Sequence, residues 1–136
     1  MKKFELLEHR ADLKIKVKGS SKEELFLNAL LGMEEGLRPE TKETKEEIKR
    51  EIRIKSIDLP ALLIDFLSEV LYLIQVNKET YHNIEFKKFA DTEVEAELLG
   101  QKVERFGEDI KAVTYHQLDV HQRKDGTWEV TVLFDV

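Results

Sequence analysis

The chain of 136 residues has a mass of 15.9 kDa, a size that predicts a single domain spanning residues 1–136. Hydrophobic residues make up 41% of it, a share that excludes a disordered chain, while charged residues make up 37%. The absence of cysteine excludes thiolate chemistry, zinc fingers and disulfides. The net charge of −6 repels phosphate backbones, so we expect no autonomous nucleic-acid binding. We find no signal peptide and no apolar run long enough to span a membrane, which predicts a cytoplasmic protein without a membrane partner.

The N-terminal segment predicts two strands followed by a helix. Apolar and charged residues alternate along residues 4–18, and this period of two is typical of half-buried strands joined by a kink. Ser20 and Glu23 match a capping box, which satisfies free N–H groups at a helix start. We expect this helix to end at Gly36 and Pro39.

The middle of the chain predicts a mobile loop, a strand and a second helix. Residues 38–47 are charged and rich in turn formers, and alternating isoleucines follow over residues 48–54. Asp58 can cap a helix whose first turn tolerates Pro60. The apolar stripe of this helix is wide, so we expect it to be the most buried one. The stripe consists of Leu62, Leu63, Phe66, Leu67, Val70, Leu71 and Ile74.

From Thr80 onward the pattern is that of strands. We expect Gly100 and Gly107 to bound a turn-rich connection between the second and third of them. Strands segregated from two helices predict an α+β fold, a two-layer sandwich with a mainly antiparallel sheet and the element order ββαβαββββ. The four strands are predicted over residues 84–89, 94–98, 110–122 and 128–135.

The last two strands predict a hairpin with a defined register. A three-residue loop at 124–126, with Gly126 in the left-handed bulge position, places Val120 opposite Val130. The same register puts His116 opposite Phe134 and Tyr115 beside Asp135.

Motifs of conventional catalysis are missing from the sequence. It has no cysteine, no G-x-S-x-G element, no P-loop and no G-x-G-x-x-G motif. The four histidines, at positions 9, 82, 116 and 121, lack the spacing of a zinc site. An enzyme of conventional type is therefore disfavoured.

Two acidic spots, one near each end of the chain, nevertheless carry more charge than a purely structural role requires. Asp12 ends a run of ionisable residues at a bend, and Asp135 lies in an apolar C-terminal strand next to the terminal carboxylate of Val136. They are either a polar turn and a frayed strand end, or oxygen ligands for Ca²⁺ or Mg²⁺. Lys111 and His116, in a third segment, are either a solubilising lysine and a core histidine or parts of the same site.

These segments together resemble the archease family over essentially the whole chain. The shared motifs are His9-Arg10-Ala11-Asp12, the helix from Asp58 to Leu73, the stretch from Lys111 to His116, and the terminal Phe134-Asp135-Val136. The sequence departs from the family pattern at Arg10, where the family often has threonine, and at Gln101, where it often has glutamate.

The resemblance implies a non-catalytic cofactor of an RtcB-type tRNA-splicing RNA ligase, which promotes guanylylation of the ligase and its multiple turnover. It also implies a divalent-cation site at Asp12, Asp135 and Val136, a functional Lys111, and a partner surface that includes His9 and His116. Two alternatives remain open: a chaperone-like modulator of a tRNA methyltransferase, and a small metal-dependent enzyme that uses Asp12 and Asp135. Weak homo-oligomerisation is left open as well.

Overall fold

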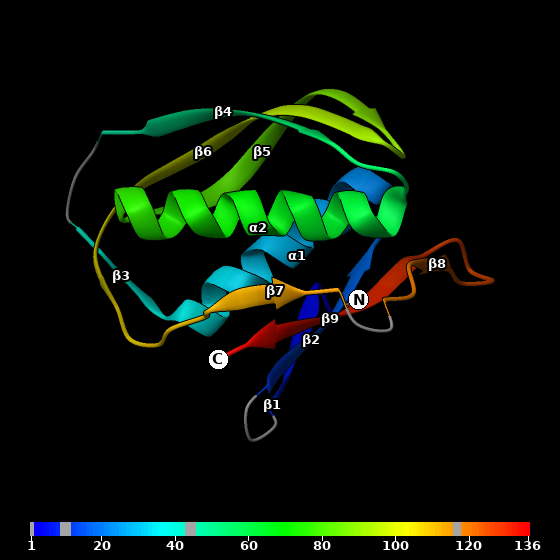
Figure 1. Ribbon diagram of the computed structural model, residues 1–136, viewed down its shortest axis with the longest axis horizontal. Helices are drawn as coiled ribbons and strands as arrows, with labels where there is room; N and C mark the ends of the chain where they lie inside the picture. The colour runs from blue at the N-terminus through cyan, green and yellow to red at the C-terminus, as the bar shows by residue number, and fades with distance from the viewer. Residues whose placement is uncertain (1, 9–11, 43–45, 116–117) are drawn as a thin grey trace.

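The strands form two antiparallel sheets with both helices between them (Figure 1). The computed structural model describes residues 2–8, 12–42, 46–115 and 118–136. Its elements are β1 (Phe4–Glu8), β2 (Asp12–Gly19), α1 (Lys22–Leu37), β3 (Pro39–Thr41), β4 (Ile48–Lys55), α2 (Leu59–Asn77), β5 (Glu79–Ala90), β6 (Glu93–Phe106), β7 (Ala112–Thr114), β8 (His121–Gln122) and β9 (Trp128–Asp135). The predicted α+β class with two helices and antiparallel pairing is confirmed.

The two sheets differ in how their strands are connected along the chain. The first has the order β1-β2-β9-β7, with β8 also paired to β9, so the C-terminal strand lies beside an N-terminal one. In the second, β6 pairs with β4 and β5, and its last residues pair with β3. The prediction had a single layer of strands; the division into two sheets allows both helices to be covered on two sides.

Helix α2 is the core helix that its wide apolar stripe predicts. The carboxylate of Asp58 accepts the N–H of Ala61 at 2.9 Å, which confirms the predicted cap. By length and composition this 19-residue helix could cross a membrane, a criterion that a core helix also meets. Here its apolar side chains are buried among both sheets. They are Leu59, Leu62, Leu63, Ile64, Phe66, Leu67, Val70, Leu71 and Ile74.

The ends of α1 differ from the prediction by one or two residues. The cap is Ser21, whose hydroxyl accepts the N–H of Glu24 at 3.1 Å, while the Glu24 carboxylate accepts the N–H of Ser20. The helix continues through Gly36 to Leu37, and Arg38 takes the left-handed conformation at φ 49° that a C-terminal glycine usually adopts.

Two predicted loops are partly strands. Residues 39–41 form β3, which pairs with residues 103–106 of β6, while residues 43–45 lie outside the described residues. The predicted connection from Gly100 to Gly107 is wrong, because β6 runs without a break to Phe106. Gly100 is needed within the strand: a Cβ atom there would lie 1.9 Å from the Thr80 carbonyl oxygen, next to a bulge in β5.

The C-terminal hairpin confirms the predicted turn but not a continuous strand. His121 pairs with Glu129 in the predicted register, and Gly126 has φ 89°. Farther along, Ala112 rather than Tyr115 lies opposite Asp135, and Val113 rather than His116 lies opposite Phe134. The segment between β7 and β8 thus contains three more residues than a continuous ladder, so the predicted strand over residues 110–122 is wrong as a single element.

Replacing Gly100 with alanine tests the close approach of β5 and β6. The added methyl group meets backbone rather than a flexible side chain, so we expect the free energy of unfolding to fall by about 1–3 kcal/mol. Urea unfolding measures the loss. Gly107→Ala is the matched control, because its methyl group would mainly meet the Arg38 side chain; an equal loss in both variants would contradict the assignment.

Candidate functional site

The N-terminal and C-terminal acidic spots meet at one end of the five-stranded sheet. In the ladder between β2 and β9, Asp12 is the direct partner of Asp135. Directly paired residues of antiparallel strands have Cα atoms only about 4.5–5.5 Å apart and share a face of the sheet. The structure therefore brings these two carboxylates together as expected, and we call Asp12, Asp135 and Val136 the carboxylate site.

Lys111 lies on the other side of Asp135. Its backbone N–H donates to the Asp135 carbonyl oxygen at 2.7 Å, and Ala112 is the Cα partner of Asp135 in β7. Lys111 is exposed and lines a groove of about 240 Å³ between α2 and β7, together with Tyr72 and Gln75. The start of β7, the end of β9 and the start of β2 thus share one end of the sheet.

A second cavity of about 260 Å³ adjoins the carboxylate site. Asp12 and Val136 line it from the sheet, while Glu35 and Arg38 line it from the C-terminal end of α1. Glu108 and Asp109 contribute two more carboxylates, and Arg38 lies 3.9 Å from Glu108. The cavity is therefore strongly acidic with one guanidinium group at its edge.

The donor set of the carboxylate site fits a hard divalent cation in part. Asp12, Asp135 and the terminal carboxylate offer oxygen atoms only, which Ca²⁺ and Mg²⁺ prefer, and both ions accept water as remaining ligands. Among the described residues, however, no three His, Asp or Glu side chains lie close enough to form a complete metal site. His9 and His116 lie outside the described residues, so their predicted roles stay predictions.

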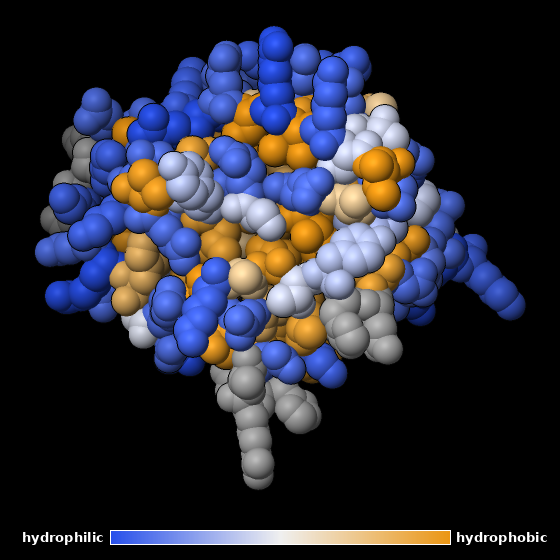
Figure 2. All heavy atoms as spheres, in the orientation of Figure 1, coloured by the Kyte–Doolittle hydropathy of each residue, from blue (hydrophilic) through white to orange (hydrophobic). Residues whose placement is uncertain are grey.

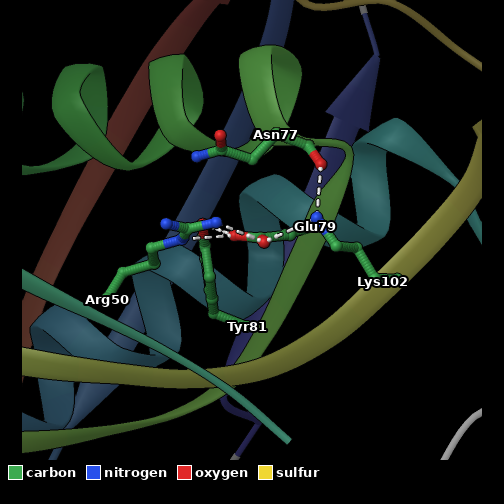
Figure 3. Close-up of polar contacts among 5 residues, drawn as sticks. All are labelled: Arg50, Asn77, Glu79, Tyr81 and Lys102. Carbon is green, nitrogen blue, oxygen red and sulfur yellow. Dashed lines mark hydrogen bonds and ion pairs between the residues drawn. The ribbon is translucent and has the colours of Figure 1, made fainter. Parts of the chain in front are cut away.

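A buried ion cluster, which the sequence analysis missed, cross-links the four-stranded sheet (Figure 3). The fully buried carboxylate of Glu79 in β5 accepts two hydrogen bonds from Arg50 in β4, at 2.8 and 2.7 Å. The Tyr81 hydroxyl donates to the same carboxylate at 2.8 Å, and Lys102 in β6 lies 3.2 Å from it. Lys102 also donates to the Asn77 carbonyl at the end of α2.

Electrostatics at Glu79 favour the charged form. Burial alone raises the pKa of Glu79, but hydrogen bonds from Arg50, Tyr81 and Lys102 outweigh it and lower the pKa to about 2. The pKa of Tyr81 is raised by burial and by the neighbouring Glu79 carboxylate. Both oxygens of the Glu79 carboxylate accept hydrogen bonds within the protein. The cluster therefore joins β4, β5 and β6 and leaves no free oxygen for a ligand.

Glu34 is the second buried acid, and its environment is the opposite one. It lies on the apolar side of α1, where it accepts hydrogen bonds from the Tyr81 N–H and the Thr80 hydroxyl. Burial dominates over these hydrogen bonds and raises the pKa of Glu34 to about 8. A sequence signal for it existed, because Glu34 stands four residues after Leu30 and three before Leu37, on the apolar stripe.

Together these features define a small α+β domain whose two helices pack between antiparallel sheets and whose paired terminal strands carry a carboxylate site. A family model described as the Archease protein family (MTH1598/TM1083) matches residues 4–136, and the chain belongs to this family.

Relatives and solved structures agree with the family. The chain is 37% identical to protein archease of Methanosarcina barkeri, over 99% of this chain and 97% of that protein, and 30% identical to protein archease of Pyrococcus abyssi over the full length of both. The solution structure of protein 1598 of Methanobacterium thermoautotrophicum is similar, with a TM-score of 0.72 and 26% identity over all of both chains. A crystal structure from Thermotoga maritima, described as an archease and possible chaperone, has a TM-score of 0.64 and 25% identity over 96% of this chain and 94% of that one.

The raised pKa of Glu34 predicts that its contribution to the stability of the folded state decreases as the pH rises. The unfolded chain releases this proton near the ordinary pKa of 4.5, whereas the folded chain holds it up to about pH 8. The folded state binds more protons between these values, so this contribution to stability falls as pH rises through the window.

Glu34→Gln keeps an amide oxygen as acceptor and removes the titration. We expect its Tm relative to wild type to rise by at least 4 °C from pH 5 to pH 8, about the shift that 1 kcal/mol produces in a domain of this size. Thermal unfolding at both pH values measures it, with Glu35→Gln, on the exposed side of the same helix turn, as the control. A Tm difference that does not change with pH would contradict the role of Glu34.

Proposed function

We propose that the chain is a non-catalytic activator of an RtcB-type tRNA-splicing RNA ligase in the cytoplasm, which promotes guanylylation of the ligase and its multiple turnover. The observation that carries the proposal is the pairing of Asp12 with Asp135 beside Lys111, in a member of the archease family. The sequence contains no cysteine nucleophile and no phosphate-binding glycine loop, so the carboxylate site is better suited to assisting another protein than to catalysis alone.

We further propose that Asp12, Asp135 and the terminal Val136 hold Ca²⁺ or Mg²⁺. Like charges directly opposite each other in a sheet are destabilising, and a cation between them would remove that cost. When bound, the cation would supply charge neutralisation for the phosphates of a nucleotidyl transfer. Lys111, exposed beside Asp135, would contact those phosphates or a carboxylate of the ligase.

An apolar area next to Lys111 supports docking to a protein partner. Tyr72 and Val76 on α2 are 58% and 60% exposed, and Tyr115 just beyond β7 is 58% exposed. Figure 2 shows hydrophobic side chains gathered over the middle of this face, surrounded by hydrophilic ones. Exposed apolar areas with a polar rim are typical of interaction sites. The same area would also serve a chaperone, and the similar Thermotoga maritima structure is described as that of an archease and possible chaperone.

Asp135→Asn tests the cation. In millimolar CaCl₂ or MgCl₂ we expect wild type to be stabilised relative to EDTA, by about 2.7 kcal/mol when the ion is at a hundredfold excess over its Kd. The variant should show no such stabilisation, and in EDTA it should be at least as stable as wild type, since one of two like charges is gone. Thermal unfolding measures both effects.

Asp119→Asn is the matched control, because this aspartate is exposed and its ion-pair partner is His121. The cation proposal fails if Asp135→Asn responds to CaCl₂ and MgCl₂ as wild type does.

Lys111→Ala and Asp12→Ala test the action on the ligase. Each variant should lower the stimulation of guanylylation about tenfold or more, because Asp12→Ala removes a proposed cation ligand and Lys111→Ala removes the proposed contact to phosphates or to the ligase. The readout is transfer of labelled GMP to the ligase, with far-UV circular dichroism to show that the fold is intact. Lys42→Ala, in the exposed segment after β3, should have no effect.

Two results would count against these roles. Full stimulation by both variants would refute the assigned residues. Ligation by the chain without any ligase would refute the activator and favour a metal-dependent enzyme.

A further inference from the structure

The outer face of the five-stranded sheet carries a row of lysines along β2. Strand residues alternate between the two faces of a sheet, and in β2 Leu13, Ile15 and Val17 are buried against the helices. The side chains that point outward are therefore Lys14, Lys16 and Lys18, and we call them the lysine row. In a protein with a net charge of −6, three successive outward positions with the same positive charge need an explanation.

Two of the three lysines form no ion pair among the described residues. Lys18 lies 3.7 Å from Glu129, which Arg123 also approaches at 3.5 Å. Among the side chains that the structure describes, neither Lys14 nor Lys16 forms an ion pair, although Glu5 is the strand partner of Lys16. The row therefore contains two positive charges, those of Lys14 and Lys16, that no ion pair among the described residues holds.

A strand of the other sheet provides the comparison for this row. Strand β4 also has three outward cations, Lys49, Arg53 and Lys55, but Glu51 occupies the outward position between the first two. Arg53 lies 3.6 Å from Glu95, and Lys55 is the strand partner of Glu93. The two strands thus carry equal numbers of outward cations, but only in β2 do these cations occupy successive outward positions with no acidic residue between them.

The row also leads directly to the carboxylate site. Asp12 occupies the next position after Lys14 in the same alternation, and it is the partner of Asp135. Lysines at every second residue of a strand are spaced about 7 Å apart, close to the separation of successive phosphates along an extended nucleic-acid strand. A single strand that follows the row would bring its end to the carboxylates.

We propose that the lysine row binds the phosphate backbone of a single-stranded RNA and directs the RNA end toward the carboxylate site. This inference rests on the proposed role in RNA ligation, because the RNA would be the substrate of the ligase. Lysines contact phosphates as point charges, so binding is independent of base sequence and decreases with salt. The net charge alone predicts no autonomous nucleic-acid binding, and the proposal departs from that expectation: the row gives weak binding of its own, measurable at low salt, and acts on RNA that the ligase already holds.

The test compares two triple variants with the same loss of charge. One is Lys14→Gln, Lys16→Gln and Lys18→Gln; the matched control is Lys49→Gln, Arg53→Gln and Lys55→Gln on β4. A fluorescent single-stranded oligouridylate is titrated with the full chain at several low salt concentrations, and fluorescence anisotropy gives the Kd. Far-UV circular dichroism shows that both variants fold.

We expect wild type and the β4 control to bind the oligouridylate with the same salt dependence. In the lysine-row variant, affinity should be lost, and the slope of log K against log salt should shrink by about 2, because each phosphate contact on a single strand contributes about 0.7. Unchanged binding by the lysine-row variant, equal losses in both variants, or no binding by wild type would overturn the proposal. Equally tight binding of polyglutamate would also overturn it and would point to an acidic protein partner.

The assay contains no ligase, so its outcome is separate from that of the guanylylation assay. Loss of RNA binding in the lysine-row variant supports this inference even if the ligase proves to be the wrong partner. Conversely, stimulation that depends on Lys111 leaves the activator role standing even if the lysine row does not bind RNA.

Discussion

The ladder between β2 and β9 is the pairing on which the candidate site depends. It joins segments at opposite ends of the sequence, and its register decides which residues face each other. Because side chains alternate with a period of two, a shift by one residue would move Asp12 and the three lysines of β2 to the buried face and expose Leu13, Ile15 and Val17. The apolar residues that the helices cover therefore fix the position of the acidic pair, and the fold and the site share one constraint.

The two buried acids, Glu79 and Glu34, are held in opposite protonation states. Glu79 is charged and fully paired, a state that stabilises only while its partners remain, since removal of one partner from a buried ion pair costs about 3–5 kcal/mol. Glu34 keeps its proton up to about pH 8, because its burial outweighs the two hydrogen bonds that its carboxylate accepts. Both acids contact Tyr81, one through the backbone N–H and the other through the hydroxyl. This residue thus ties α1 to the four-stranded sheet.

Local patterns predicted the elements of this fold, and long-range contacts explain what they missed. Alternation and capping identified β2, β9 and α2, because those signals lie within a few residues. The sequence pattern places Gly100 in a loop, because the Thr80 carbonyl that requires a glycine there belongs to another strand. The cluster around Glu79 was missed for the same reason: its partners come from β4 and β6. Residue types and the family resemblance predict Asp12, Asp135 and Lys111 as parts of one site, but the pairing that places Lys111 beside Asp135 differs from the predicted hairpin register.

The break between β7 and β8 follows from the same competition between local and long-range pairing. The turn at 124–126 fixes the register of His121 and Gln122, and continued pairing would have placed Tyr115 opposite Asp135. Instead, the side-chain amide of Gln75 on α2 donates to the Ile110 carbonyl, and the Lys111 N–H donates to the Asp135 carbonyl, so the start of β7 is held from both sides. With both ends of the segment fixed, the surplus residues have to leave the ladder between them. The contact that displaces the predicted register is therefore the one that holds Lys111 beside the carboxylates, and the irregularity in the sheet belongs to the site rather than to a defect in the hairpin.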